Sequence, residues 1–175
     1  RQGRPSSGSS VSAVTLYLVR HGKAGTRDNS DPLDTQRHLD RKGLRQAVWM
    51  ADQLGGRPIG ALWSSPLPRC LETVEPIAAR LGLDVEPTEA LTEGTDLEIT
   101  WRVVEQALLR GTDTVLCSHG DLIPALIHRA ECRGMTVEGP AGFVKGSIWI
   151  LTVDGDRTSG GTYVAPPATS ELPDS

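Results

Sequence analysis

Apolar residues along the chain form short runs that alternate with stretches in which they recur every three or four positions. The short runs are rich in Val, Leu and Ile, which is typical of buried strands. They lie at 15–19, 59–65, 114–118 and 146–153. The stretches with helical spacing lie at 42–54, 66–82, 97–109 and 122–130. This alternation predicts an α/β fold, in which helices cover both faces of a mostly parallel sheet.

Glycine and proline mark the ends of these elements. Gly55 and Gly82 are placed to end the first two helices, and Pro76 predicts a kink in the second. A short extended piece is expected at 84–86, and the glycine-rich turn before 162–165 suggests a final hairpin strand. The pattern predicts a sheet of several strands with no internal repeat.

The two ends of the chain differ in composition from its middle. Residues 1–13 are rich in Ser, Gly and Pro, which predicts a flexible tail or linker. Residues 165–175 predict a second flexible tail. The chain opens on Arg1 rather than Met, which leaves open whether it is one part of a longer protein. We expect one domain over residues 14–164.

The composition is that of an ordinary globular domain. The chain has 175 residues, of which 38% are hydrophobic and 23% charged. It has no apolar run near the roughly 18 residues that a membrane span needs, and its start lacks the apolar core of a signal peptide. These features predict a cytoplasmic protein without a membrane partner.

Charge and cysteine content narrow the function classes. The formal net charge of −4, without a long run of Lys and Arg, argues against a nucleic-acid partner. Three cysteines at irregular spacing support neither a disulfide framework nor a zinc site. A small anionic ligand remains compatible, because a few well-placed cations are enough to bind one.

Charged and polar residues follow three of the predicted strands. Arg20 and His21 come after the first strand, Arg69 lies early in the helix after the second, and His119 comes after the third. Ligands of open α/β sheets bind beyond the carboxyl ends of the strands, so these side chains should meet. Arginine grips phosphate oxygens with a planar fork, and a neutral imidazole can attack phosphorus. The pattern favours a site for a phosphoryl group.

Four segments carry a resemblance to a known family. "RHG" at 20–22, "LDRKGLRQA" at 39–47, "SSPLPRCLETVEPIA" at 64–78 and "SHGD" at 118–121 together resemble the histidine phosphatase superfamily, the phosphoglycerate mutase-like proteins. The similarity runs from about residue 16 to residue 153. It implies a three-layer α/β/α sandwich with a mostly parallel central sheet.

The resemblance also implies a mechanism that uses no metal and no cofactor. His21 would attack the phosphoryl group and form a phosphohistidine, which water then hydrolyses. Arg20, Arg69 and His119 would bind the phosphate oxygens as charge spreads over them. A carboxylic acid would protonate the leaving group.

Three carboxylates are candidates for that acid. Glu93 matches best in order the glutamate of the large mutase-like branch, although the Trp-Glu-Gly continuation of that branch is absent here. Glu89 lies in the same segment, and Asp121 lies near the position at which another branch keeps its acid. Glu93 is the preferred candidate.

The short chain and its "RHGKA" opening resemble the compact SixA-like phosphatases, some of which act on phosphohistidine in proteins. "RCLETVEPIA", "LTEG" and "KGSIW" resemble the phosphatase-like half of actinobacterial fusion proteins whose other half is a Nudix hydrolase. The expected partner is a small phosphorylated substrate, either nucleotide-derived or a phosphohistidine protein. Arg27 and Arg37 either face this anionic substrate or are simply solvated.

Two other functions stay open. A mutase would transfer the phosphoryl group to a second substrate, although this chain has little spare length for the insertions that keep water out. A non-catalytic phosphate-binding module attached to a missing Nudix-like domain would bind phosphate without turnover.

Overall fold

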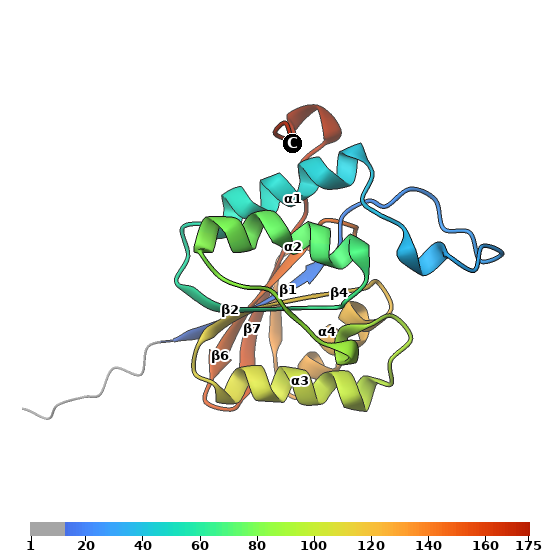
Figure 1. The fold of residues 1–175 in the computed structure, drawn as a ribbon. Helices are drawn as coiled ribbons and strands as arrows, with labels where there is room; N and C mark the ends of the chain where they lie inside the picture. The colour runs from blue at the N-terminus through green and yellow to red at the C-terminus, as the bar shows by residue number, and fades with distance from the viewer. Residues whose placement is uncertain (1–12) are drawn as a thin grey trace, which may run out of the picture.

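The computed structural model describes residues 13–175, which form a seven-stranded sheet between two pairs of helices (Figure 1). The strands follow the order β3-β2-β4-β1-β6-β7-β5, and β6 alone runs antiparallel to the rest. Their bounds are β1 Val14–Arg20, β2 Ile59–Ser64, β3 Glu86–Pro87, β4 Asp113–Ser118, β5 Thr136–Glu138, β6 Ile148–Asp154 and β7 Arg157–Val164. The predicted α/β class and mostly parallel sheet are confirmed.

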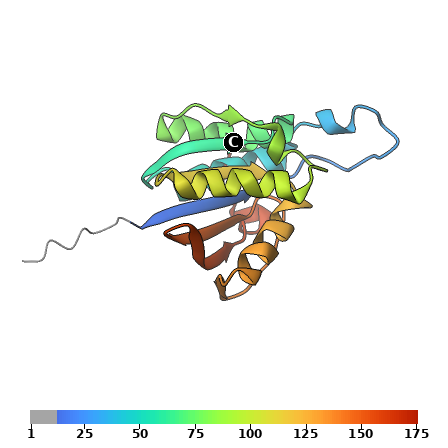
Figure 2. The same cartoon turned by 90° about the horizontal axis from the view of Figure 1, so that it is seen from below.

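Two helices cover each face of this sheet (Figures 1 and 2). The helices are α1 Arg41–Leu54, α2 Pro68–Leu81, α3 Leu97–Leu109 and α4 Leu122–Cys132, with short 3₁₀ helices at Asp34–Gln36, Glu89–Leu91 and Thr169–Glu171. Helices α1 and α2 pack on one face, and α3 and α4 pack on the other. The arrangement is the three-layer α/β/α sandwich that the sequence predicts.

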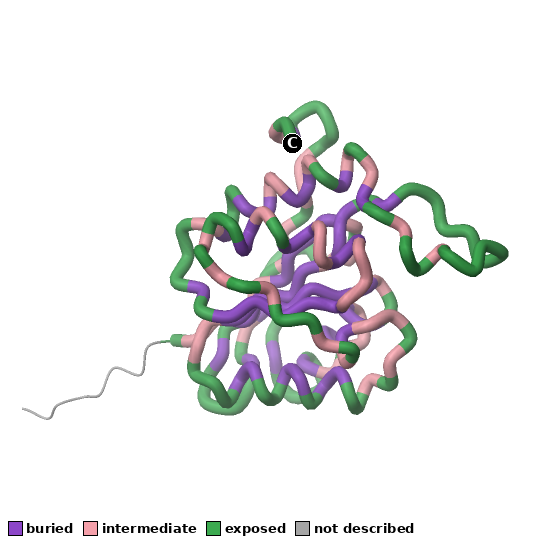
Figure 3. Tube along the Cα trace, in the orientation of Figure 1, coloured by how far each residue is buried: buried purple, intermediate pink, exposed green. Residues whose placement is uncertain are grey.

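Alternation along the central strand β1 divides the core into two layers. Leu16 and Leu18 belong to the apolar cluster beneath α3 and α4, whereas Tyr17 and Val19 belong to the cluster beneath α1 and α2. Burial along the strands is visible in Figure 3, where the centre of the sheet is the most continuously buried part of the molecule. A strand buried on both faces has a fixed register, which fixes the residues at its carboxyl end.

Caps set the starts of two helices. The Asp40 carboxylate accepts a hydrogen bond from the Gly43 amide, so α1 begins at Arg41, one residue before the predicted start. The Asp96 carboxylate caps α3 in the same way. Helix α2 continues through Pro76, and Gly82 ends it in the left-handed conformation, as predicted.

Two segments differ from expectation. The three-residue strand β5, which pairs with β7, has no counterpart among the predicted strands, because a strand this short carries no readable alternation. Residues 165–175 are predicted to be a flexible tail, whereas in the structure Leu172 is buried and Arg45 of α1 donates to its carbonyl at 2.6 Å. The predicted N-terminal tail lies almost entirely outside the described residues.

The segment that joins β1 to α1 extends away from the body of the domain (Figure 1). It leaves the sheet at the carboxyl end of β1 and carries Arg27 and Arg37. Across the described residues, none of the helices is apolar and long enough to cross a bilayer.

Candidate functional site

The register of the sheet brings the two candidate histidines together. Arg20, the last residue of β1, pairs with Ser118, the last residue of β4, and the two histidines follow them in sequence. The ring centroids of His21 and His119 lie 5.2 Å apart, edge to face. They lie beyond the carboxyl ends of parallel strands, where ligands of such sheets bind. A cavity of about 340 Å³ opens there, lined in part by Arg20, His21 and Arg69.

His21 is held in one tautomer. Its Nδ1 atom lies 2.8 Å from the Gly22 carbonyl oxygen, which can only accept, so Nδ1 carries the proton. Its Nε2 atom therefore has a lone pair, which accepts from Arg69 Nε at 3.3 Å. Burial, together with the positive charges of Arg69 and Arg20, lowers the pKa of His21 to about 3. The imidazole is neutral at physiological pH, as a nucleophile must be.

Arg69 lies in the first turn of α2 and is almost completely buried. Besides contacting His21, it donates from Nη2 to Glu93 Oε2 at 2.9 Å. One turn further along α2, the Thr73 hydroxyl donates to the Arg69 carbonyl and accepts from the Gly22 amide at 3.0 Å. The start of α2 thus holds both the arginine and the backbone beside His21.

Arg20 rests directly on the backbone of Gly120. A Cβ atom at position 120 would lie 2.5 Å from Cζ of Arg20, so only glycine leaves room for the guanidinium. Arg20 Nη1 donates to the Phe143 carbonyl at 2.5 Å, while its buried Nε has no hydrogen-bond partner within residues 13–175. Burial lowers the pKa of Arg20 from its usual value. The orphaned N–H is a donor suited to an anion in the cavity.

His119 is anchored through one ring nitrogen. Its Nε2 atom lies 2.8 Å from Ser65 Oγ and 3.5 Å from Cys70 Sγ. Its buried Nδ1 atom has no partner in the described part of the chain. Both histidines are therefore held by the protein, and their rings meet edge to face.

The motif at 39–47 supports the loop that carries His21. Asp40 bonds to Lys23 Nζ and to the Gly25 amide, and the buried Gln46 side chain accepts from the Lys23 amide. A Cβ atom at position 43 would lie 2.0 Å from the Lys23 carbonyl oxygen, so this glycine allows α1 to approach the loop. The motif holds the site from outside, because neither Gly43 nor Gln46 lines the cavity.

The three candidate acids are placed differently. Glu93 lines the cavity and bridges Arg69 and Arg27, with both N–O distances 2.9 Å. Asp121 also lines the cavity and accepts from the Gly94 amide at 2.8 Å. Glu89 does not line the cavity and lies instead in a neighbouring surface depression, which Glu93 also lines. The structure thus brings two of the three carboxylates to the candidate site.

Three further cations line the same cavity, namely Arg27, Arg37 and Lys145. The sequence analysis named Arg27 and Arg37 as candidates to face an anion but assigned no role to Lys145. It also missed Thr73, although a residue four positions after Arg69 lies on the same helical face. No comparable signal marks Lys145, whose place depends on how the loop before β6 folds.

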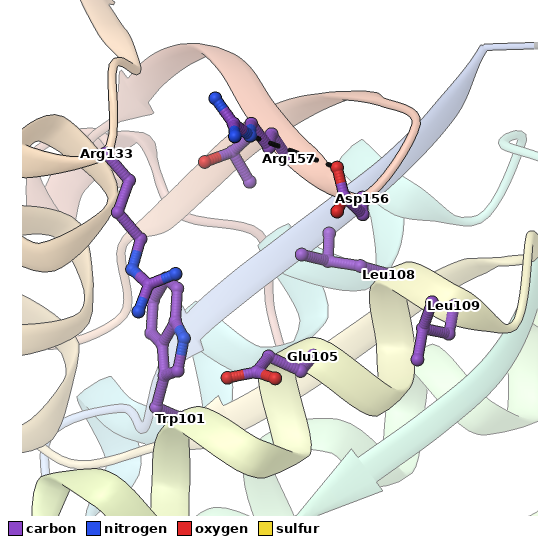
Figure 4. Close-up of a pocket in the computed structure, with 8 residues that line it drawn as sticks. Trp101, Glu105, Leu108, Leu109, Arg133, Asp156 and Arg157 are labelled. Carbon is purple, nitrogen blue, oxygen red and sulfur yellow. Dashed lines mark ion pairs between the residues drawn. The ribbon is translucent and has the colours of Figure 1, made fainter.

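A second cavity, of about 450 Å³, lies at the other end of the sheet, beside α3 and the β6–β7 turn (Figure 4). Its wall is formed by Trp101, Leu108 and Leu109, and the Arg133 guanidinium lies 5.2 Å from the indole centroid. It contains no histidine. A covalent phosphohistidine therefore cannot form in this larger cavity.

Comparisons with known proteins match segments that contain residues of this site. The family model described as histidine phosphatase superfamily (branch 1) matches residues 16–96, which include His21, Arg69 and Glu93. The resemblance to the histidine phosphatase superfamily is confirmed. A protein of Mycolicibacterium smegmatis named 8-oxo-(d)GTP phosphatase is 32% identical over 164 residues, covering 90% of this chain and 50% of that protein. The chain spans about half the length of this curated relative.

Solved structures show the histidine phosphatase fold. The protein histidine phosphatase SixA complexed with tungstate matches with a TM-score of 0.68 and 24% identity, over 90% of this chain and 98% of that one. A mycobacterial glucosyl-3-phosphoglycerate phosphatase matches with a TM-score of 0.60 and 20% identity, over 80% of this chain and 90% of that one.

Within residues 13–175, no three His, Cys, Asp or Glu side chains gather so as to hold a metal ion.

Proposed function

We propose that the chain is a metal-independent phosphatase that hydrolyses a phosphomonoester or a phosphohistidine through a covalent phosphohistidine at His21. One observation carries this proposal: a buried, neutral imidazole has its Nε2 lone pair at a cavity lined by arginines. The relative named 8-oxo-(d)GTP phosphatase supports a nucleotide-derived phosphate as the substrate.

The first step transfers the phosphoryl group to the enzyme. His21 Nε2 donates its electron pair to phosphorus, and the bond from phosphorus to the leaving atom breaks with its electrons on that atom. Arg20, Arg69 and the unpartnered Nδ1 of His119 bind the phosphoryl oxygens. The Gly22 carbonyl stabilises the imidazolium that forms, because Nδ1 keeps its proton and its hydrogen bond.

The second step releases phosphate. Water attacks the phosphorus of the phosphohistidine, the P–N bond breaks, and its electron pair returns to Nε2. For its role in the first step, Glu93 enters protonated and gives its proton to the leaving atom. The resulting carboxylate then takes one proton from the attacking water in the second step. The phosphoryl group competes with Glu93 for Arg69, so substrate binding frees one carboxylate oxygen to face the leaving group.

The nucleophile is tested with p-nitrophenyl phosphate in the presence of EDTA, with release of p-nitrophenol as the readout. We expect His21→Ala to lower kcat/KM by about 10³-fold or more, because the covalent route is lost. His38→Ala is the matched control, since His38 is exposed and bonds to Glu72 outside the cavity. Equal turnover by His21→Ala and the unchanged protein would exclude His21 as the nucleophile. Phosphate binding without turnover would favour a non-catalytic module.

The acid is tested with two leaving groups. Glu93→Gln should lower kcat/KM for both an alkyl phosphate and p-nitrophenyl phosphate, and the loss for the alkyl phosphate should be larger by about tenfold or more. The reason is that only the alkoxide needs a proton as it leaves. Asp121→Asn is the matched comparison, since Asp121 lines the same cavity. A leaving-group dependence in Asp121→Asn alone would transfer the role to that carboxylate.

A further inference from the structure

The cavity holds more positive charge than one phosphoryl group requires. Five cationic side chains and two carboxylates line it, in a chain whose net charge is −4. Two of the five, Arg20 and Arg69, contact or adjoin the two histidines. The other three are Arg27, Arg37 and Lys145.

The two outer arginines are held in place by the protein. Arg37 Nη1 donates to the Ala24 carbonyl and its Nε lies 2.9 Å from an Asp34 carboxylate oxygen. Arg27 Nη1 contacts Glu93, and its Nε donates to Asn29 Oδ1 at 2.8 Å. A guanidinium has five N–H donors, so each arginine keeps donors for a ligand after these bonds are made.

Lys145 is the least compensated of the three. Its side chain is half-buried, and its ammonium makes no ion pair with any residue in the range 13–175. Burial and the neighbouring charges of Arg20, Arg37 and Lys23 lower the pKa of Lys145. Gln46 fixes its backbone by donating to the Lys145 carbonyl at 3.3 Å. A half-buried cation that faces other cations costs free energy unless an anion binds among them.

Lys23 shows the contrast. Its ammonium contacts the Asp40 carboxylate at 2.8 Å, and it does not line the cavity. Asp40 thus forms an ion pair with Lys23, whereas Lys145 forms none among the described residues and Asp40 offsets only part of the effect of its positive neighbours. The unbalanced charge lies inside the cavity rather than on the surface around it.

We propose that Arg27, Arg37 and Lys145 form a second anion subsite, which binds another phosphoryl group in the leaving part of the substrate. The substrate class that this inference names rests on the proposed phosphatase function. His21 would take the terminal phosphoryl group, and the retained phosphate would lie among the outer cations. A nucleoside diphosphate has this chemistry, and so does a nucleoside 3′,5′-bisphosphate.

Binding tests the subsite without turnover. Methylenebisphosphonate and methylphosphonate differ by one phosphonate group, and neither is hydrolysed. In calorimetry with EDTA present, we expect the bisphosphonate to bind about tenfold or more tightly than the monophosphonate. Equal affinity for these two ligands, together with equal affinity for adenosine 5′-monophosphate and adenosine 3′,5′-bisphosphate, would overturn the subsite.

Variants assign the preference to residues. Lys145→Met should reduce the bisphosphonate preference to about threefold or less, and so should Arg27→Gln. Arg27 is exposed, so its substitution should leave folding intact. Arg102→Gln is the matched control. Arg102 is an exposed residue of α3 that does not line the cavity, so this substitution removes the same charge outside the proposed subsite. A full preference retained in both Lys145→Met and Arg27→Gln would contradict the proposal.

Turnover measurements distinguish a diphosphate from a 3′,5′-bisphosphate as the substrate. They also test the anion subsite separately from the proposed phosphatase function. Adenosine 5′-monophosphate, 5′-diphosphate and 3′,5′-bisphosphate are compared by phosphate release. Faster release from one doubly phosphorylated compound, abolished in Lys145→Met, identifies the spacing that the subsite accepts. Tight bisphosphonate binding without any turnover would refute the proposed phosphatase and leave the subsite standing. Turnover with no preference for a second phosphoryl group in binding or rate would do the reverse.

Discussion

The cavity at the carboxyl ends of the strands and the cavity beside α3 differ in what their walls can do. The first has a volume of about 340 Å³ and the second about 450 Å³. The smaller one contains a buried imidazole in a fixed tautomer and a buried arginine that contacts it. The larger one is walled by leucines and an indole, and its ion pair between Asp156 and Arg157 is exposed to solvent.

The difference shows that chemistry depends on groups whose positions the backbone fixes. His21, Arg20 and His119 extend directly from strands in register, and Arg69 from the first turn of a helix that packs on the same sheet. Of the arginines of the larger cavity, Arg133 follows the last residue of α4 and Arg157 begins β7, with an exposed side chain. Single substitutions in the walls of the two cavities test this difference.

Apart from His21 itself, the largest expected effect is at Arg69. Arg69→Lys should lower kcat/KM for p-nitrophenyl phosphate by about 10²-fold, because a lysine cannot contact His21, Glu93 and a phosphoryl oxygen from one planar group. Arg80→Lys in the same helix is the control, since Arg80 is half-exposed and pairs with Asp52 outside the cavity. Similar rates for the two variants would show that the arginine geometry is not needed.

A glycine provides the next test. Gly120→Ala should lower kcat/KM by about tenfold or more, because the added methyl group would displace the Arg20 guanidinium from its position. Gly56→Ala adds the same methyl group where no atom lies within 4 Å. We expect normal rates from Gly56→Ala in the same assay, and normal rates from Gly120→Ala would show that Arg20 need not occupy this position.

The titration of His21 links the site to stability. Its pKa is about 3 in the folded protein, against 6.5 for an ordinary histidine, so below pH 6.5 the unfolded chain binds a proton that the folded chain does not. Stability should therefore fall by about 1.4 kcal/mol per pH unit from this group as pH drops from 6.5 toward 3. Urea unfolding of the unchanged protein and of His21→Asn measures the difference between them. A difference that stays constant across this range would contradict a neutral, buried His21.

The smallest effect is expected in the larger cavity. Trp101→Phe should leave kcat/KM unchanged and lower the free energy of unfolding by less than about 1.5 kcal/mol, since it keeps an aromatic ring and removes an indole N–H that has no partner among the described residues. Thermal unfolding and phosphate release from p-nitrophenyl phosphate give the two readouts. A large loss of activity at normal stability would mean that the two cavities are coupled.

Much of this arrangement follows from local sequence. The strand Val14–Arg20 contains the mostly apolar run at 15–19, and Arg20 and His21 directly follow that run, so strand and site are predicted together. His119 is found in the same way beyond β4. Helix α3 has the predicted bounds, because Asp96 caps it and its apolar residues keep helical spacing.

The remaining features depend on contacts between distant segments. Lys145 reaches the cavity only because the loop before β6 bonds to Gln46 and Arg20, 99 and 123 residues away in sequence. The choice between Glu93 and Asp121 depends on a contact between two loops, from the Gly94 amide to the Asp121 carboxylate. The burial of Leu172 depends on packing of the C-terminal segment, which also bonds to Arg45. None of these contacts leaves a periodic signal in the sequence.

The most direct test of the account is to trap the phosphoenzyme. The protein is mixed with p-nitrophenyl phosphate, quenched rapidly in base and digested, and its peptides are examined by mass spectrometry. The account predicts one added phosphoryl group on His21, stable in base and lost in acid, and no such group in His21→Ala. A phosphoryl group on another residue, or turnover by a protein in which His21 is never phosphorylated, would contradict it.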